Sequence, residues 1–159
     1  MAVEDKYVDS NTTSGKLAAP YEVGGDLICL VKTFEVAAAD DDTSTYRIAR
    51  VNGDWVPVEI TVMCDAITGG TDYDLGIYLP GVGGAAKDAD VLMDGQTLAV
   101  ASRVLDGLQT VDIANLEKKI YVHAGDSTST RVADYDLVLT GNTVGTAAGT
   151  VTIVAKFAK

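Results

Sequence analysis

The sequence predicts a mainly β protein, an antiparallel β-sandwich or barrel with one short helix and an extended N-terminal arm. Three observations lead to this prediction: several short segments alternate apolar and polar residues, turns rich in glycine or aspartate separate them, and no series of strands alternating with helices is visible. The length of 159 residues suits one domain. We expect this domain to span residues 26–159 and the arm to span residues 1–25.

The N-terminal arm, residues 1–25, mixes charged, hydroxyl-bearing and glycine residues without a period of either kind. A terminus of this composition is often disordered when nothing holds it. The arm nevertheless carries spaced apolar residues that suit docking onto a neighbouring subunit. These candidate partner-binding residues are Tyr7, Val8, Leu17 and Tyr21.

The first strand is predicted in DLICLVKTFEVAAA, which begins at Asp26 and is rich in apolar and β-branched residues. The acidic residues 40–42 then predict a tight turn. The following segment, TYRIARV, alternates imperfectly and leads to Asn52-Gly53, a dipeptide that predicts a β-hairpin.

The strand after this hairpin is predicted in WVPVEITVMCDA, where the period of two is clear. Pro57 removes a backbone donor, so the start of the strand should lie at an edge or a bulge. The residues expected to share the buried face are Ile60, Val62, Cys64 and Ala66.

Three aspartates flank the next turn, residues 68–71, and raise the question of a metal site. Asp72 and Asp74 share one face of a strand whose other face carries Tyr73, Leu75, Ile77 and Leu79. With Asp65 across the turn they could hold a hard cation, but aspartates on the water-facing side of a hairpin are more frequent, and we expect that role. The letters DYDL return at residues 134–137, which suggests two similar strand starts in one sheet system.

The second half of the chain contains the predicted helix. Residues 86–107 fit neither period and stay unassigned. A helix is predicted from about Asp112, a good N-cap, to Ala124, because apolar residues recur at helical spacing and Gly125 suits a left-handed stop. A strand through Ile120 and Val122 is the alternative. The chain ends in two predicted strands, the last with alternating Val151, Ile153, Ala155 and Phe157.

The charge of the chain excludes some partners. Twenty-three acidic and 12 basic residues give a net charge of −11, which repels phosphate backbones and anionic membranes, so we expect neither nucleic acid nor membrane as a partner. The opening residues lack the basic start and apolar run of a secretory signal, which predicts a protein made and kept in a cytosol. Cys29 and Cys64 sit in apolar segments and read as small buried residues, with a disulfide possible.

Residues typical of catalysis or cofactor binding are sparse. The one histidine, His123, has no nucleophile motif near it and is expected at the surface or at a helix end. Residues 81–84 are glycine-rich but lack the lysine and hydroxyl of a phosphate-binding loop, so we expect a flexible connector there. Trp55 could stack on a sugar, although a core or edge position is more common. We therefore expect no catalytic residue, no metal and no cofactor.

Five segments carry a resemblance to a known family: KYVDSNTTSGKLA, FEVAAADDDTSTYRIARV, CDAITGGTDYDLGIY, DADVLMDGQTLA and LTGNTVGTAAGTVTI. Together they resemble small virion proteins of tailed bacteriophages that are encoded close to the major capsid protein. The resemblance implies a non-enzymatic capsid cement or decoration protein that binds the outer surface of the capsid shell.

This resemblance also sets expectations for partners and location. Its partners would be the major capsid protein and further copies of itself, with a trimer favoured, and it would be made in the host cytoplasm and reside on the virion. The alternative function is a phage head or tail appendage module that binds host surface glycan.

Overall fold

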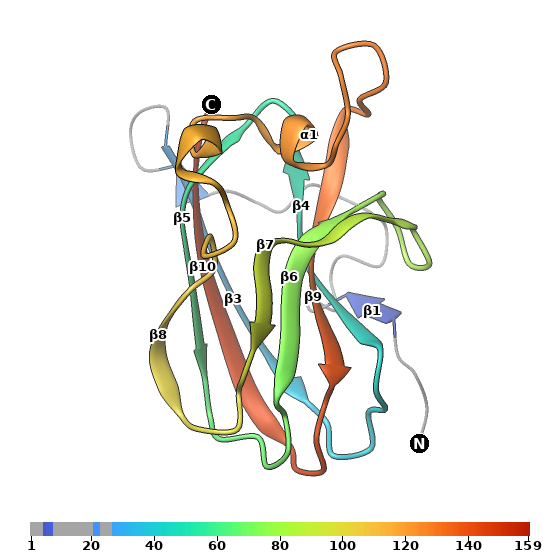
Figure 1. Cartoon of the computed structure of the whole chain (residues 1–159), viewed down its shortest axis with the longest axis vertical. Coiled ribbons are helices and arrows are strands. Elements are labelled where there is room, and N and C mark those ends of the chain that lie inside the picture. Colours follow the sequence, from blue (N-terminus) through green and yellow to red (C-terminus); the bar gives the residue numbers. More distant parts are fainter. Residues whose placement is uncertain (1–4, 8–20, 23–26) are drawn as a thin grey trace.

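The computed structural model describes residues 5–7, 21–22 and 27–159, which form a sandwich of two β-sheets (Figure 1). The first sheet has the strand order β1-β4-β9-β6-β7, and the second has the order β2-β3-β10-β5-β8. All neighbouring strands are antiparallel except β1 and β4, which are parallel. The predicted antiparallel sandwich is confirmed. The alternative architecture, a barrel, is not formed.

The strands vary in length from two to eleven residues. Those of the first sheet are β1 (Asp5–Tyr7), β4 (Ser44–Asn52), β9 (Asp134–Thr143), β6 (Asp72–Tyr78) and β7 (Ala86–Gln96). Those of the second sheet are β2 (Tyr21–Glu22), β3 (Leu27–Val36), β10 (Gly149–Ala158), β5 (Val56–Cys64) and β8 (Ser102–Asp106).

Most connections cross from one sheet to the other. The strands β3, β4, β5 and β6 alternate between the second and the first sheet, and β9 and β10 do the same. The hairpin predicted at Asn52-Gly53 is therefore wrong as a strand pairing: the turn exists, with the Trp55 amide donating to the Asn52 carbonyl at 3.1 Å, but it leads across the sandwich. Hydrophobic side chains on both flanking strands favour this crossing, because each sheet must bury one face against the other.

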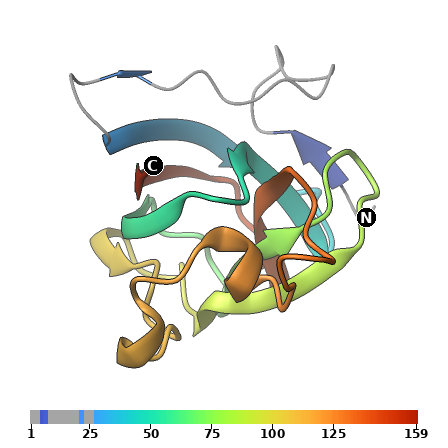
Figure 2. The ribbon, with the colours of Figure 1, turned by 90° about the horizontal axis from the view of Figure 1, so that it is seen from above.

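The core lies between the two sheets, whose layers are seen along their strands in Figure 2. The period-two predictions are confirmed in β5 and β10, whose inward residues are buried: Ile60, Val62, Cys64, Val151, Ile153, Ala155 and Phe157. Ala66, expected on the same buried face, is exposed, because it lies beyond the end of β5 at Cys64. The bulge expected at Pro57 is also present, since the register of β10 on β5 shifts between Lys156 and Phe157, opposite Pro57. The two cysteines are free thiols, Cys64 buried and Cys29 half-buried.

The helical segment is shorter than the predicted range from Asp112 to Ala124. It consists of a 3-10 turn, η2 (Ile113–Asn115), and a single α-helical turn, α1 (Ile120–His123). Asp112 caps η2 by accepting a hydrogen bond from the Ala114 amide at 2.9 Å, and Gly125 adopts the expected left-handed conformation. Ile113 and Leu116 are exposed while Ile120 is buried, so no continuous apolar face exists to stabilise a longer helix.

The unassigned residues 86–107 contain β7 and β8. Two residues of β6, Leu75 and Ile77, are in register with Met93 and Asp88 of β7, so β7 carries extra residues between these two pairs. The bulge breaks the alternation of side chains along β7. This irregular pairing explains why neither a strand period nor a helix period fits the segment.

Candidate functional site

A β-bulge in β4 brings two arginines to one face of the first sheet. Residues three apart on a regular strand point to opposite faces, but the register of β4 on β9 shifts between Arg47 and Ala49. Arg47 is therefore in register with Val138, and Arg50 is in register with Asp136, on the face directed away from the core. The bulge also accounts for the imperfect alternation of TYRIARV.

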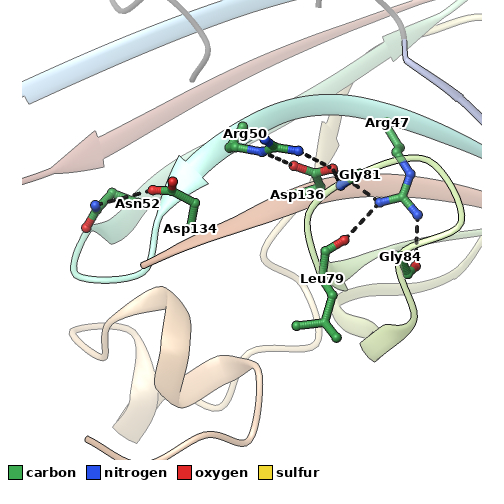
Figure 3. Close-up of polar contacts among 8 residues, drawn as sticks. All are labelled: Arg47, Arg50, Asn52, Leu79, Gly81, Gly84, Asp134 and Asp136. Atoms are coloured by element: carbon green, nitrogen blue, oxygen red, sulfur yellow. Dashed lines mark hydrogen bonds and ion pairs between the residues drawn. The ribbon is translucent and has the colours of Figure 1, made fainter. Parts of the chain in front are cut away.

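Asp136 of β9 lies between these two arginines (Figure 3). Its carboxylate accepts hydrogen bonds from Arg50 Nε at 2.8 Å, from Arg47 Nη1 at 3.2 Å and from the Gly81 amide at 2.9 Å. The Asp136 side chain is 0% exposed and that of Arg47 is 1% exposed. Each carboxylate oxygen is therefore held by charged or polar donors, as a buried carboxylate requires.

The same cluster fastens the loop between β6 and β7 to the sheet. Arg47 donates to the Leu79 carbonyl at 3.2 Å and to the Gly84 carbonyl at 2.8 Å (Figure 3). In Figure 1 this hairpin reaches from β6 and β7 towards β9 and β4. The expected glycine-rich connector at residues 81–84 is thus tied down by a buried ion pair. Because a guanidinium stays protonated and cannot exchange a proton with Asp136, the arrangement is suited to holding structure rather than to acid–base chemistry.

Asp74 is buried as well, contrary to the expected water-facing position. It is 7% exposed and accepts hydrogen bonds from the Gly95 amide at 2.8 Å and from Asn142 Nδ2 at 2.6 Å. Burial raises the pKa of Asp74, and these two hydrogen bonds oppose that rise. The extra residues of β7 cover this face, which the pattern of β6 alone does not reveal.

Asp65, Asp72 and Asp74, the three aspartates considered as a metal site from the sequence, do not come together. Asp72 and Asp74 both approach Asn142, at 3.4 and 2.6 Å. Asp65 follows β5 in the other sheet and accepts a hydrogen bond from the Thr150 amide at 3.4 Å. Within residues 27–159 and the two short arm strands, no group of three or more His, Cys, Asp or Glu residues is placed to hold a metal ion.

The two DYDL segments begin neighbouring strands of one sheet, β6 and β9, as expected. Their third residues, Asp74 and Asp136, are both buried on the outer face of the first sheet but have different partners. Their tyrosines point into the core, where Tyr73 donates to the Val144 carbonyl at 2.8 Å and Tyr135 donates to Asp126 at 2.7 Å. The repeat therefore marks a shared strand geometry.

His123 ends α1, as predicted, but it is buried. Burial lowers the pKa of His123, and a hydrogen bond to the Lys118 backbone partly offsets this effect. Its Nε2 atom is buried without a hydrogen-bond partner in the described part of the chain. No serine, threonine or cysteine nucleophile is paired with it there, so the geometry offers no catalytic dyad.

Trp55 takes the core position that the sequence favours. Its ring packs against Phe157 with the ring centroids 5.9 Å apart, and it is half-buried. The Trp55 carbonyl also accepts a hydrogen bond from the Ile120 amide at 2.8 Å, which anchors α1. Through these contacts the Trp55 ring covers part of the core.

The arm contributes β1 and β2 to the two sheet edges on the same side of the sandwich. Tyr7 is in register with Arg47 of β4, and Tyr21 is in register with Cys29 of β3. The other two candidate partner-binding residues, Val8 and Leu17, lie outside the described residues.

No helix in the described part of the chain is long and apolar enough to cross a membrane.

The polar cluster around Asp136 was missed by reasoning from the sequence. Its signal was present in two places: the charged residues Arg47 and Arg50 within an otherwise apolar strand, and the second copy of DYDL. On a regular strand without this bulge, Arg47 and Arg50 would point to opposite faces of the sheet and would not form one site.

Comparison with solved structures identifies similar folds in phage capsids. A chain from the capsid of Ralstonia phage GP4 matches with a TM-score of 0.66 and 15% sequence identity, over 97% of this chain and 98% of that one. A chain from the cyanophage Pam1 capsid asymmetric unit matches with a TM-score of 0.52 and 15% identity, over 94% of this chain and 96% of that one. The sequence matches no protein-family model and no curated protein. The fold of this chain is therefore one that occurs among the chains of phage capsids.

Proposed function

We propose that this chain is a non-enzymatic structural protein of a phage virion, a cement or decoration protein that binds the outer surface of the major capsid shell and stabilises it. The observation that carries the proposal is the similarity to the Ralstonia phage GP4 capsid chain, which covers nearly the whole of both chains. A match of this extent concerns the fold of nearly the whole chain rather than one part of it.

The chemistry of the buried polar groups supports a structural role. Asp136 is saturated by Arg47, Arg50 and the Gly81 amide, and Asp74 is held by Gly95 and Asn142. These groups fasten the chain's own loops and strands. A rigid scaffold with satisfied polar groups is suited to a protein that works by its shape and surface.

The charge of the chain supports an outward position. A net charge of −11 disfavours contact with packaged DNA. In this proposal the chain is made in the host cytoplasm, forms a homotrimer and joins the shell after the shell has assembled, and the arm residues Tyr7, Val8, Leu17 and Tyr21 contact neighbouring subunits. Any protein that binds only the assembled state shifts the equilibrium towards that state in proportion to its occupancy.

The test is reconstitution on capsids that lack this protein. Purified chain is added to such heads and, as a control, to unassembled major capsid protein, and the bound copies are counted after sedimentation. We expect saturable binding to the heads and a higher temperature for head disruption and DNA release. Failure of the purified, folded chain to bind the heads would contradict the proposal. The size of the free protein in solution tests the trimer separately.

A further inference from the structure

The outer faces of the two sheets differ in how they are covered. The outer face of the first sheet carries Val138, which is fully buried, and Gly76, where an added Cβ would overlap the backbone of Asp88 and Ala89 in β7. The loop after β6 is fastened over the same face by Arg47. The centre of this face is therefore covered by the chain itself and is not available as a contact surface.

The outer face of the second sheet carries apolar and threonine side chains that are exposed or half-buried. Val31 of β3 is in register with Val154 of β10, and Val154 is in register with Thr61 of β5. The next row across the same strands consists of Thr33, Thr152 and Met63. Val31 is 48% exposed, and Val104 on the edge strand β8 is 77% exposed. We call the surface formed by these residues the valine-threonine face.

Charged side chains lie at the margins of the valine-threonine face. Glu35 and Asp65 stand at one end, on either side of Thr150, and both accept hydrogen bonds from that residue, at 2.9 and 3.4 Å. Asp106 lies at the β8 edge, in register with Thr61. Towards the other end, Lys156 neutralises Glu59 at a distance of 2.7 Å. Among the side chains that the structure describes here, the centre is uncharged, and the margin is acidic at the Glu35 end and at the β8 edge.

From this pattern we propose that the valine-threonine face is a docking surface for another protein whose contact patch is apolar at its centre and carries Lys or Arg at its margin. An apolar centre with a polar rim is the usual anatomy of a protein interface. Charge complementarity selects the partner, because acidic margins attract a basic rim. A second copy of this chain is disfavoured, because it would bring acidic margins together in a protein of net charge −11. That the partner is the capsid shell rests on the proposed function.

The test places a charge on the exposed apolar side chains of the face. Val31→Lys and Val104→Lys change side chains that are already exposed, so the fold should be retained, and the melting temperature verifies this. The matched control is Val82→Lys, because Val82 is 62% exposed and lies in the loop after β6, away from the second sheet. Binding to heads that lack the protein is measured for the wild type and for the three variants. We expect at least a tenfold loss of affinity for Val31→Lys and Val104→Lys, on the order of what an unpaired charge costs in a dry contact, and no loss for Val82→Lys.

The possible outcomes separate this inference from the proposed function. If the wild type binds and all three variants bind equally well, the valine-threonine face is not the docking surface, although the proposed function stands. If the wild type does not bind, the proposed function fails and the shell is excluded as the partner. If Val31→Lys or Val104→Lys instead dissociates an oligomer of the free protein in sedimentation experiments, the face joins copies of this chain and the inference is wrong.

The basic rim of the partner has a test of its own. Glu35→Lys reverses a marginal charge while leaving the apolar centre intact. We expect slower association with heads at low salt and a difference from the wild type that shrinks as salt is added, because screening weakens interactions between exposed charges. Equal or faster association of Glu35→Lys would overturn the assignment of a basic rim.

Discussion

Arg47 and Asp136 are 89 residues apart in the sequence, yet their side chains form an ion pair at 3.2 Å on neighbouring strands, almost completely shielded from water. The pair connects three elements, since Arg47 also binds the carbonyls of Leu79 and Gly84. It therefore joins β4, β9 and the loop after β6 into one unit.

Asp136→Asn should destabilise the fold strongly. Removing the charge leaves the buried Arg47 and the partly exposed Arg50 beside a neutral group, and breaking a buried pair in this way costs about 3 to 5 kcal/mol. The free energy of unfolding, measured by denaturant titration, is expected to fall by about this amount. Asp54→Asn is the matched control, because Asp54 forms ion pairs with Lys119 and Arg131 at an exposed position and its loss should change stability little. Equal effects of the two substitutions would contradict the role assigned to Asp136.

Asp74→Asn should be milder than Asp136→Asn and should show a distinct pH dependence. Burial raises the pKa of Asp74 above its ordinary value of 3.8, so the folded chain binds a proton there more readily than the unfolded chain does. The wild type should therefore gain stability relative to Asp74→Asn as the pH falls from 7 through the raised pKa towards about 4. Denaturant titrations of both proteins across this range measure the difference. A difference that is constant with pH would show that the folded state does not perturb Asp74.

His123 should give the opposite pH dependence. Its pKa is lowered below the ordinary value of 6.5 by burial, so the unfolded chain takes up the proton first. The contribution of neutral His123 to the free energy of unfolding is complete above about pH 6.5 and is lost as the pH falls below this value. Comparison with His123→Gln isolates the effect from that of the carboxylates: the wild type should lose stability relative to this variant as the pH falls below about 6.5. Parallel stability curves for the two proteins would mean that His123 is solvated.

The features predicted correctly from the sequence are those that depend on local patterns. Alternation identified the buried faces of β5 and β10, Pro57 indicated the bulge, and Asp112 and Gly125 marked the two ends of the helical segment. Each of these signals is contained within a few neighbouring residues, and the fold class follows from their sum.

The features that could not be predicted depend on contacts between distant segments. The turn at Asn52-Gly53 has the same local chemistry whether the next strand pairs beside it or crosses to the other sheet. Likewise, Asp74 looks solvated until the extra residues of β7 cover it, and Arg47 reaches Asp136 only because of the bulge in β4. Tertiary packing decides such cases, and the local sequence pattern does not specify it.

Deletion of residues 1–25 tests the arm. The proposed function predicts that residues 26–159 alone stay folded but lose binding to heads, because the arm contacts neighbouring subunits. The structure adds that β1 and β2 lie on the edges of β4 and β3, so the deletion also uncovers two strand edges that are prone to association. Circular dichroism and sedimentation of the truncated chain must therefore accompany the measurement of head binding.

Point variants in the full-length chain separate these two effects of the deletion. Val8→Asp and Leu17→Asp alter apolar residues that are proposed as anchors and lie outside β1 and β2, whereas Thr12→Asp and Thr13→Asp add the same charge at polar positions of the same arm. We expect the first two variants to bind heads more weakly than the wild type and the last two to bind normally, because an ionised carboxylate is costly in an apolar contact and harmless in water. Uniform binding by all four variants, together with normal binding by the truncated chain, would show that the arm serves only to cover the edges of its own sheets.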